Sequence, residues 1–142
     1  MAACIKKIIP DKADNIIKGT GRILIAEDEA VLRNLMENIV TELGYTVLSG
    51  TNGEDAVRVF RKKSEELDLI ILDMIMPELN GRDAMIECMK IKPGVNVILC
   101  SGYSMNIDMS TVMDSGNLLF LQKPVTISSL SHTIARALGL EK

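Results

Sequence analysis

The sequence has few of the residue types on which zinc sites, disulfide frameworks and aromatic cores depend. Its 142 residues include one histidine, three cysteines and no tryptophan. A zinc site with two or more histidine ligands is therefore excluded, and any histidine-based active site would have to use His132. The cysteines form no C-x-x-C pair, which favours a reducing cytoplasm over a disulfide framework, with Cys88 and Cys100 as buried apolar residues.

Strong charge of one sign and long apolar runs are also missing. The formal net charge is −3, so we expect no direct nucleic-acid binding, which needs a basic surface to contact phosphates. No apolar run approaches the ~18 residues of a membrane-spanning helix, so we expect no membrane insertion. The composition is globular, with 47% hydrophobic and 25% charged residues but only 3% aromatics. The core must therefore be built mainly from aliphatic residues and methionine.

A regular alternation of strand-like and helix-like segments begins at Arg22. Short apolar runs predict strands over residues 23–26, 45–48, 67–72, 95–100 and 118–121. Apolar residues at helical spacing predict helices over 32–43, from Asn52–Gly53, from Asn80–Gly81 to before Pro93, and over 127–138, with a weak helix over 104–115. Residues 22–140 are thus predicted to form an α/β doubly wound (βα)5 domain, a flavodoxin-like three-layer sandwich with a parallel sheet ordered 2-1-3-4-5. Residues 1–21 are expected to be a partly ordered leader or linker.

Chemically reactive side chains stand where the predicted strands end. Glu27 and Asp28 follow the first strand, Asp73 follows the third, Ser101 ends the fourth and Lys123 follows the fifth. The carboxyl ends of parallel strands share one edge of the sheet, where open α/β sheets bind ligands. We therefore expect these side chains to meet in one crevice.

Each of these residues also has a simpler interpretation. Asp28 could cap the first helix, Ser101 before Gly102 could belong to a turn, and Lys123 could be a solvated surface charge. Their coincidence at the ends of several predicted strands favours a shared site. Three carboxylates close together repel one another and need a cation, and hard oxygen ligands select Mg²⁺ or Mn²⁺. A lysine and a hydroxyl beside a metal-bound aspartate suit phosphoryl transfer, with the aspartate as nucleophile.

The motifs match a known family. From about Arg22 to Leu138 the chain resembles the receiver domain of two-component response regulators. The resemblance is carried by the segments Ile-Leu-Ile-Ala-Glu27-Asp28-Glu29, Leu-Asp73-Met-Ile-Met-Pro77 with Asn80-Gly81, Ser101-Gly102 and Phe120-Leu-Gln-Lys123-Pro124. Each motif is weak alone, but together they are highly specific.

The resemblance implies a metal site and a phospho-acceptor. Asp73 would accept the phosphoryl group. Mg²⁺ (or Mn²⁺) would be bound by the side chains of Asp28 and Asp73, by the backbone carbonyl of Ile75, and by Glu27 through water. A domain of this kind is not a conventional enzyme by itself, but it catalyses its own phosphorylation and dephosphorylation.

The resemblance also implies a switch. Lys123 would pair with the phosphoryl group and Ser101 would hydrogen-bond it, while Phe120 stands where the family has a rotameric aromatic residue. Their movement would repack the face formed by the fourth helix (residues 104–115), the fifth strand and the last helix. This face is also a candidate homodimer surface.

The resemblance implies a histidine kinase or phosphotransfer protein as the partner. His132 is expected on the last helix, away from the acidic residues, so the phosphohistidine would come from that partner or from an upstream domain. The leader around Ile8-Ile9-Pro10 is similar to the junction between a kinase ATPase domain and an attached receiver. We therefore expect the C-terminal receiver of a hybrid sensor histidine kinase, with a stand-alone regulator as the alternative.

Functions of other classes fit the sequence less well. An aspartate-nucleophile phosphohydrolase needs a second acid two residues after the nucleophile, where this chain has Ile75. A flavodoxin-like electron carrier needs a phosphate-binding first loop, and the Glu27–Asp28 pair would repel phosphate. A receiver that acts as a docking module without phosphorylation stays open as an alternative.

Ile75 and Tyr103 stand two positions after Asp73 and Ser101, at positions that tune phosphate loss in receivers. Neither side chain offers a carboxylate or amide to orient an attacking water, so we expect a long-lived acyl phosphate. Ile75→Asn should therefore speed phosphate loss severalfold, measured by following the phosphorylated species after removal of the donor. Equal rates in the two proteins would contradict this expectation.

Overall fold

The computed structural model describes residues 16–74, 80–101, 118–123 and 125–139. In chain order the elements are β1 (Arg22–Ala26), α2 (Ala30–Glu42), β2 (Thr46–Gly50), α3 (Gly53–Lys63), β3 (Leu69–Asp73), α4 (Gly81–Ile91), β4 (Asn96–Ser101), β5 (Leu118–Gln122) and α6 (Ile127–Ala137). The helix predicted over 104–115 lies outside the described residues. No helix among the described residues is long and apolar enough to span a bilayer.

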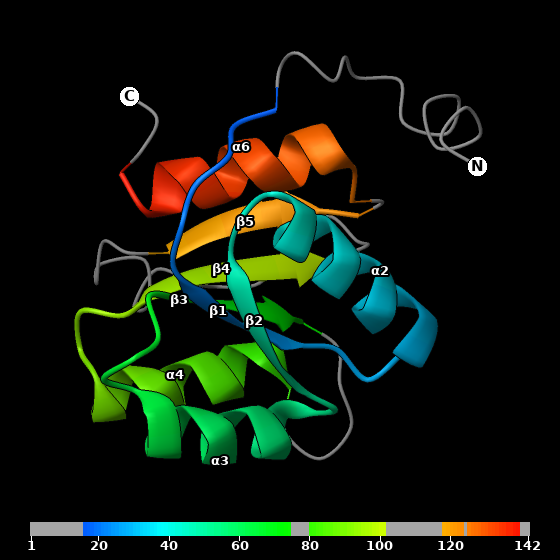
Figure 1. Ribbon diagram of the computed structural model, residues 1–142. Helices are drawn as coiled ribbons and strands as arrows, with labels where there is room; N and C mark the ends of the chain where they lie inside the picture. The colour runs from blue at the N-terminus through cyan, green and yellow to red at the C-terminus, as the bar shows by residue number, and fades with distance from the viewer. Residues whose placement is uncertain (1–15, 75–79, 102–117, 124, 140–142) are drawn as a thin grey trace.

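The five strands form one parallel sheet in the order β2-β1-β3-β4-β5 (Figure 1). Helices α2 and α6 cover one face of this sheet, and α3 and α4 cover the other. The predicted α/β fold class and strand order are therefore confirmed. All five residues of β3 are buried, as expected for a strand with neighbours on both sides and helices on both faces.

Alternate residues of each strand supply the two cores. In β1, Leu24 and Ala26 pack with α3 and α4, whereas Ile23 and Ile25 pack with α2 and α6. Burial of such an aliphatic side chain stabilises the fold by roughly 1.5–3 kcal/mol. The strand boundaries differ from the prediction where a residue is buried but does not pair with a neighbouring strand. Leu67 is 1% exposed but precedes β3, because its amide bonds the Lys63 carbonyl in the turn after α3.

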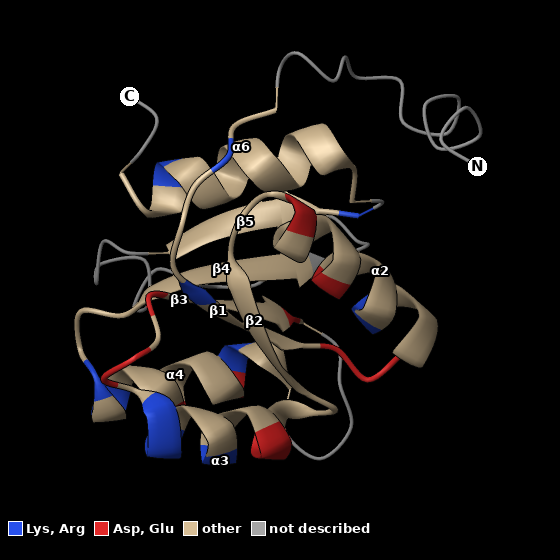
Figure 2. Cartoon of the chain, in the orientation of Figure 1, with Lys and Arg blue, Asp and Glu red and all other residues tan. Residues whose placement is uncertain are grey.

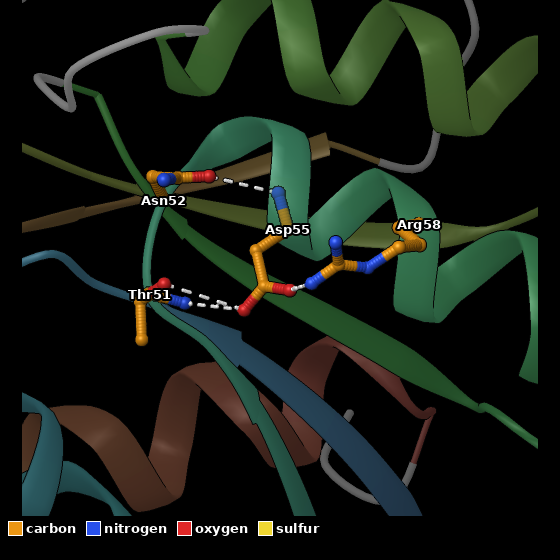
Figure 3. Close-up of polar contacts among 4 residues, drawn as sticks. All are labelled: Thr51, Asn52, Asp55 and Arg58. Carbon is orange, nitrogen blue, oxygen red and sulfur yellow. Dashed lines mark hydrogen bonds and ion pairs between the residues drawn. The ribbon is translucent and has the colours of Figure 1, made fainter.

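Three of the described helices begin at side-chain caps. The Asn52 side chain accepts a hydrogen bond from the Asp55 amide at the start of α3, as Figure 3 shows. The Asp55 carboxylate in turn accepts from the Thr51 amide and pairs with Arg58 (Figure 3). The hydrogen bond from the Thr51 amide lowers the pKa of Asp55, burial raises it, and Arg58 lowers it further, so that the pKa is lowered overall. Equivalent caps open the other two helices, from Asn80 in α4 and from Thr126, through a capping box, in α6.

The α2 helix begins differently. Its N-cap is Glu29, whose side chain makes no capping hydrogen bond. The alternative interpretation of Asp28 as a helix cap is therefore wrong, since the helix begins one residue later in the chain. This leaves the Asp28 carboxylate available for other contacts.

The last residues of the predicted leader lie against the domain. The Ile17 amide donates to Ser131 Oγ of α6 at 3.2 Å, and the Gly19 amide donates to the Leu43 carbonyl at 3.0 Å. Gly44 has φ +108°, and a Cβ there would lie 2.3 Å from the Gly19 carbonyl oxygen. Only glycine satisfies both constraints at this position. Residues 16–19 therefore pack along α6 and the end of α2.

Gly81 has no space for a side chain beside the end of β3. A Cβ at this position would lie 2.2 Å from the backbone oxygen of Asp73 and 2.9 Å from Met74 Cα. The Gly81 amide also donates to the Met74 carbonyl at 3.0 Å. The start of α4 is thus packed directly on the backbone that carries Asp73.

Gly81→Ala should lower the free energy of unfolding by about 1–3 kcal/mol, because the β3–α4 backbone must move to admit the methyl group. Urea denaturation measures this change. Gly94→Ala is the matched control, since a Cβ at Gly94 meets no atom within 4 Å and should change stability by less than ~0.5 kcal/mol. Similar losses in both variants would show that the contact with Asp73 is not the cause.

Candidate functional site

The acidic residues gather at the edge of the sheet where the parallel strands end. Glu27 directly follows β1, Asp73 is the last residue of β3, and Lys123 directly follows β5. β1 and β3 are neighbours, with Ala26 paired to Leu72, although 46 residues separate these two in sequence. Figure 2 shows the acidic loop between β1 and α2 at this edge. The chain therefore places the predicted site at the switch point of the doubly wound sheet.

One ammonium group contacts two carboxylates in this site. Lys123 Nζ lies 3.1 Å from Asp73 Oδ1 and 3.3 Å from Glu27 Oε1. Lys123 is therefore not a solvated surface charge, and its side chain is only 23% exposed. Burial by itself would lower the pKa of Lys123, but the hydrogen bonds and charges of Asp73 and Glu27 raise it overall. The ammonium group is held in its charged form.

Three carboxylates come together around this ammonium group. One carboxylate oxygen from each of Glu27, Asp28 and Asp73 lies within 4.8 Å of the other two. Glu27 and Asp73 are buried, whereas Asp28 is exposed to solvent. The cluster therefore opens to solvent on the Asp28 side.

The pKa of Glu27 is raised by its surroundings in the cluster. Burial, together with the charge of Asp73, raises the pKa of Glu27 to about 7, even though its bond from the Glu29 amide and the charge of Lys123 lower it. The bond from Glu29 and the charge of Lys123 thus do not offset the combined effect of burial and of Asp73 on Glu27. A divalent cation among these oxygens would add positive charge, and carboxylate oxygens are ligands that Mg²⁺ and Mn²⁺ accept. The residues fit the predicted metal.

Backbone and side-chain bonds fix the loop that carries Glu27 and Asp28. The Glu27 amide donates to the Gly50 carbonyl of β2 at 3.2 Å, and the Glu29 amide donates to Glu27 Oε2 at 3.2 Å. In addition, Arg33 Nη1 donates to the Glu27 carbonyl oxygen at 2.8 Å. The sequence interpretation missed Arg33. A basic residue in the first turns of a helix, where the helix dipole favours acidic residues, is the signal that could have found it.

The remaining predicted residues are described only in part. Ser101 is the last residue of β4, paired with Gln122 of β5, and its side chain is not described. Phe120 lies in β5, half-buried against the core under α3 and α4. Ile75 and Tyr103 lie outside the described residues. Their predicted roles stay predictions.

The thiols and the histidine lie as expected. Cys88 and Cys100 are free and buried, and burial raises the pKa of each thiol to about 12. Neither is therefore a reactive nucleophile near neutral pH. His132 lies half-buried on α6.

A comparison with protein families shows which family the chain belongs to. The family model of the response regulator receiver domain matches residues 23–135. This chain belongs to the response regulator receiver family. It is thus a receiver domain of two-component systems, a class that interacts with histidine kinases or phosphotransfer proteins.

The relatives of this receiver include proteins of very different length. The chemotaxis protein CheY of Thermotoga maritima is 36% identical over 104 residues, which are 72% of this chain and 85% of that protein. The sensor kinase CckA of Brucella abortus is 28% identical over 138 residues, which are 97% of this chain but 14% of that kinase. The receiver is therefore similar both to a small regulator and to one part of a much longer kinase.

A solved receiver shares the fold of this chain. The response regulator TrrA of Thermotoga maritima, determined in complex with Mg²⁺ and BeF, superposes with a TM-score of 0.72 at 30% identity. The alignment covers 83% of this chain and 99% of that one. A relative with the same fold thus binds Mg²⁺.

Lys123→Met should lower the free energy of unfolding by about 1–3 kcal/mol in metal-free buffer at pH 8, where the buried carboxylates lose their cationic partner. Chemical denaturation in the presence of a chelator measures the loss. Lys90→Met removes an exposed lysine that pairs with Glu87, and should cost less than ~1 kcal/mol. Equal losses in the two variants would rule out a special stabilising role for Lys123.

Proposed function

We propose that this receiver accepts a phosphoryl group on Asp73 from the phosphohistidine of a partner kinase or phosphotransfer protein, in a Mg²⁺-dependent reaction. The observation that carries the proposal is the ammonium group of Lys123, 3.1 Å from Asp73 Oδ1 within a cluster of three carboxylates. A site of this composition can attract both a divalent cation and the oxygens of a phosphoryl group. The family match supports this chemistry.

The residues divide the work of the transfer. A carboxylate oxygen of Asp73 attacks phosphorus, the bond from phosphorus to the donor nitrogen breaks, and an acyl phosphate forms on Asp73. Lys123 pairs with an oxygen of the transferred group, and Ser101 donates a hydrogen bond to another. Asp28, Asp73 and the backbone carbonyl of Ile75 would hold the metal, and Glu27 would hold it through water. When bound, Mg²⁺ offsets the charge of these carboxylates and of the phosphoryl oxygens.

The metal and Lys123 act on the same negative charges. Lys123 bonds both Asp73 and Glu27, the carboxylates around which a cation would bind. A cation bound among the carboxylates would neutralise part of the negative charge that Lys123 otherwise neutralises. The ammonium group could then pair with an oxygen of the phosphoryl group without leaving the charges of Glu27 and Asp73 unpaired.

The phosphorylated receiver signals through the face that contains β5 and α6. On phosphorylation Ser101 moves toward the new group and Phe120 turns inward, which repacks this face for a partner or for a second copy of the chain. The half-buried position of Phe120 in β5 is compatible with such a change. The same receiver reverses the modification by hydrolysing its acyl phosphate.

The receiver is proposed to function next to a sensor kinase in the cytoplasm. The similarity to the Brucella sensor kinase spans 97% of the chain and so extends into residues 1–21, which supports a linker to a kinase domain. The similarity to the chemotaxis protein supports a stand-alone regulator as the second candidate. A cytoplasmic location agrees with the free, buried thiols of Cys88 and Cys100.

Incubation with a small phosphodonor and Mg²⁺ should add the mass of one phosphoryl group to the intact protein. The gain should disappear in Asp73→Asn and in the presence of a chelator. Asp68→Asn is the matched control, because Asp68 precedes β3 at its opposite end and should leave the gain unchanged. No gain in the unchanged protein would instead favour a docking module that works without phosphorylation.

A further inference from the structure

One side chain links α2 to the loop that carries the acidic cluster. Arg33 is the fourth residue of α2, and its amide bonds the Glu29 carbonyl in the first turn of the helix. Its guanidinium group reaches back and donates from Nη1 to the Glu27 carbonyl oxygen at 2.8 Å. Helical side chains tilt toward the N-terminus of their helix, which makes this reach a natural one. The contact joins α2 to the end of β1, which precedes it in the chain.

The position of Arg33 is electrostatically unfavourable for the helix alone. The N-terminal end of a helix dipole is positive and disfavours a cation. α2 has no acidic residue in its first turn and no side-chain cap that would offset this charge. Local rules of this kind are broken most often at functional sites. The hydrogen bond to the Glu27 carbonyl explains why an arginine is tolerated at this place.

The bond to the Glu27 carbonyl fixes the peptide that leads into Asp28. The peptide between Glu27 and Asp28 is planar, so holding its oxygen also orients the Asp28 amide and Cα. Glu27 is held at three other points, by Gly50, Glu29 and Lys123. The Asp28 side chain is exposed, and no hydrogen bond to it is found within the described part of the chain. The place of its carboxylate therefore depends on the backbone that Arg33 holds.

We propose that Arg33 is a positioning residue for the metal site, which orients the Glu27–Asp28 peptide so that the Asp28 carboxylate faces Asp73. Arg33 does this through the backbone and touches neither the metal nor the phosphoryl group. This inference rests on the proposed Mg²⁺-dependent phosphorylation. It concerns how tightly the cation is held and not which residue accepts the phosphoryl group.

The charge of Arg33 and its hydrogen bond act on metal affinity in opposite directions. A positive charge near three carboxylates weakens the binding of a cation, so removing the charge alone would tighten Mg²⁺ binding. Removing a group that orients a metal ligand weakens binding, typically by about 10–100-fold. The direction of the change therefore tells the two roles apart.

The test measures Mg²⁺ affinity in three variants of the full chain by calorimetric titration. Arg33→Met keeps much of the aliphatic stem but removes the donor, and should weaken Mg²⁺ binding by roughly 10-fold. Arg33→Lys keeps a donor that can bond one carbonyl, and should bind Mg²⁺ more tightly than Arg33→Met. Arg58→Met removes a surface arginine of α3 that pairs with Asp55, and should stay within about threefold of the unchanged protein.

Phosphorylation kinetics give a second measurement. In Arg33→Met the Mg²⁺ concentration for half-maximal phosphorylation should rise, while the rate at saturating Mg²⁺ stays near that of the unchanged protein. Circular dichroism checks that each variant is folded. If Arg33→Met is not folded, the Mg²⁺ affinity of Arg33→Lys is compared with that of the unchanged protein instead.

The outcomes separate this inference from the proposed function. Unchanged or tighter Mg²⁺ binding in Arg33→Met overturns the positioning role, as does an Arg33→Lys variant that binds Mg²⁺ no better than Arg33→Met. If the unchanged protein neither binds Mg²⁺ nor gains a phosphoryl group, the proposed function itself fails. Weaker binding in Arg33→Met with recovery in Arg33→Lys supports the inference.

Discussion

The ammonium group of Lys123 lies between carboxylates that belong to two other strands of the sheet. It contacts Asp73 at the end of β3 and Glu27 just after β1. Since Lys123 itself follows β5, these contacts join the ends of three strands. Without a cation, this edge would hold two buried carboxylates in close proximity, which folded proteins avoid unless the charges are paired. The contact of Lys123 therefore accounts for the pairing of both buried carboxylates at this edge. In the proposed function the same contact would loosen when a divalent cation and a phosphoryl group are bound.

Much of the fold could be predicted because its signals are local and repeated. Continuous apolar runs predict buried parallel strands, and the caps at Asn52, Asn80 and Thr126 mark the starts of three helices. The strand predicted over 67–72 begins two residues before β3, because Leu67 is buried in a turn and not in the strand. An apolar pattern reports burial, and burial continues past the last residue that pairs with a neighbouring strand.

The candidate site could be predicted only in its composition. That the strand ends meet follows from the parallel sheet, but which carboxylate is buried does not. Glu27 and Asp28 are adjacent in sequence, yet one is 2% exposed and the other faces solvent. The contact of Arg33 with a backbone carbonyl was missed for a similar reason. The Glu27 carbonyl that accepts from Arg33 has no signature of its own in the sequence, so the pairing of these two groups could be found only in three dimensions.

The docked segment at residues 16–19 fixes the direction from which the polypeptide enters the domain. Gly19 bonds the end of α2, while the acidic cluster lies at the start of this 13-residue helix, roughly 20 Å away. At Ile17 the chain is thus anchored on the surface of α6. An anchor of this kind shortens the effective linker to an attached module and restricts the volume that such a module can explore. For a donor carried on the same polypeptide, the anchor would set the local concentration at which it meets the acidic edge.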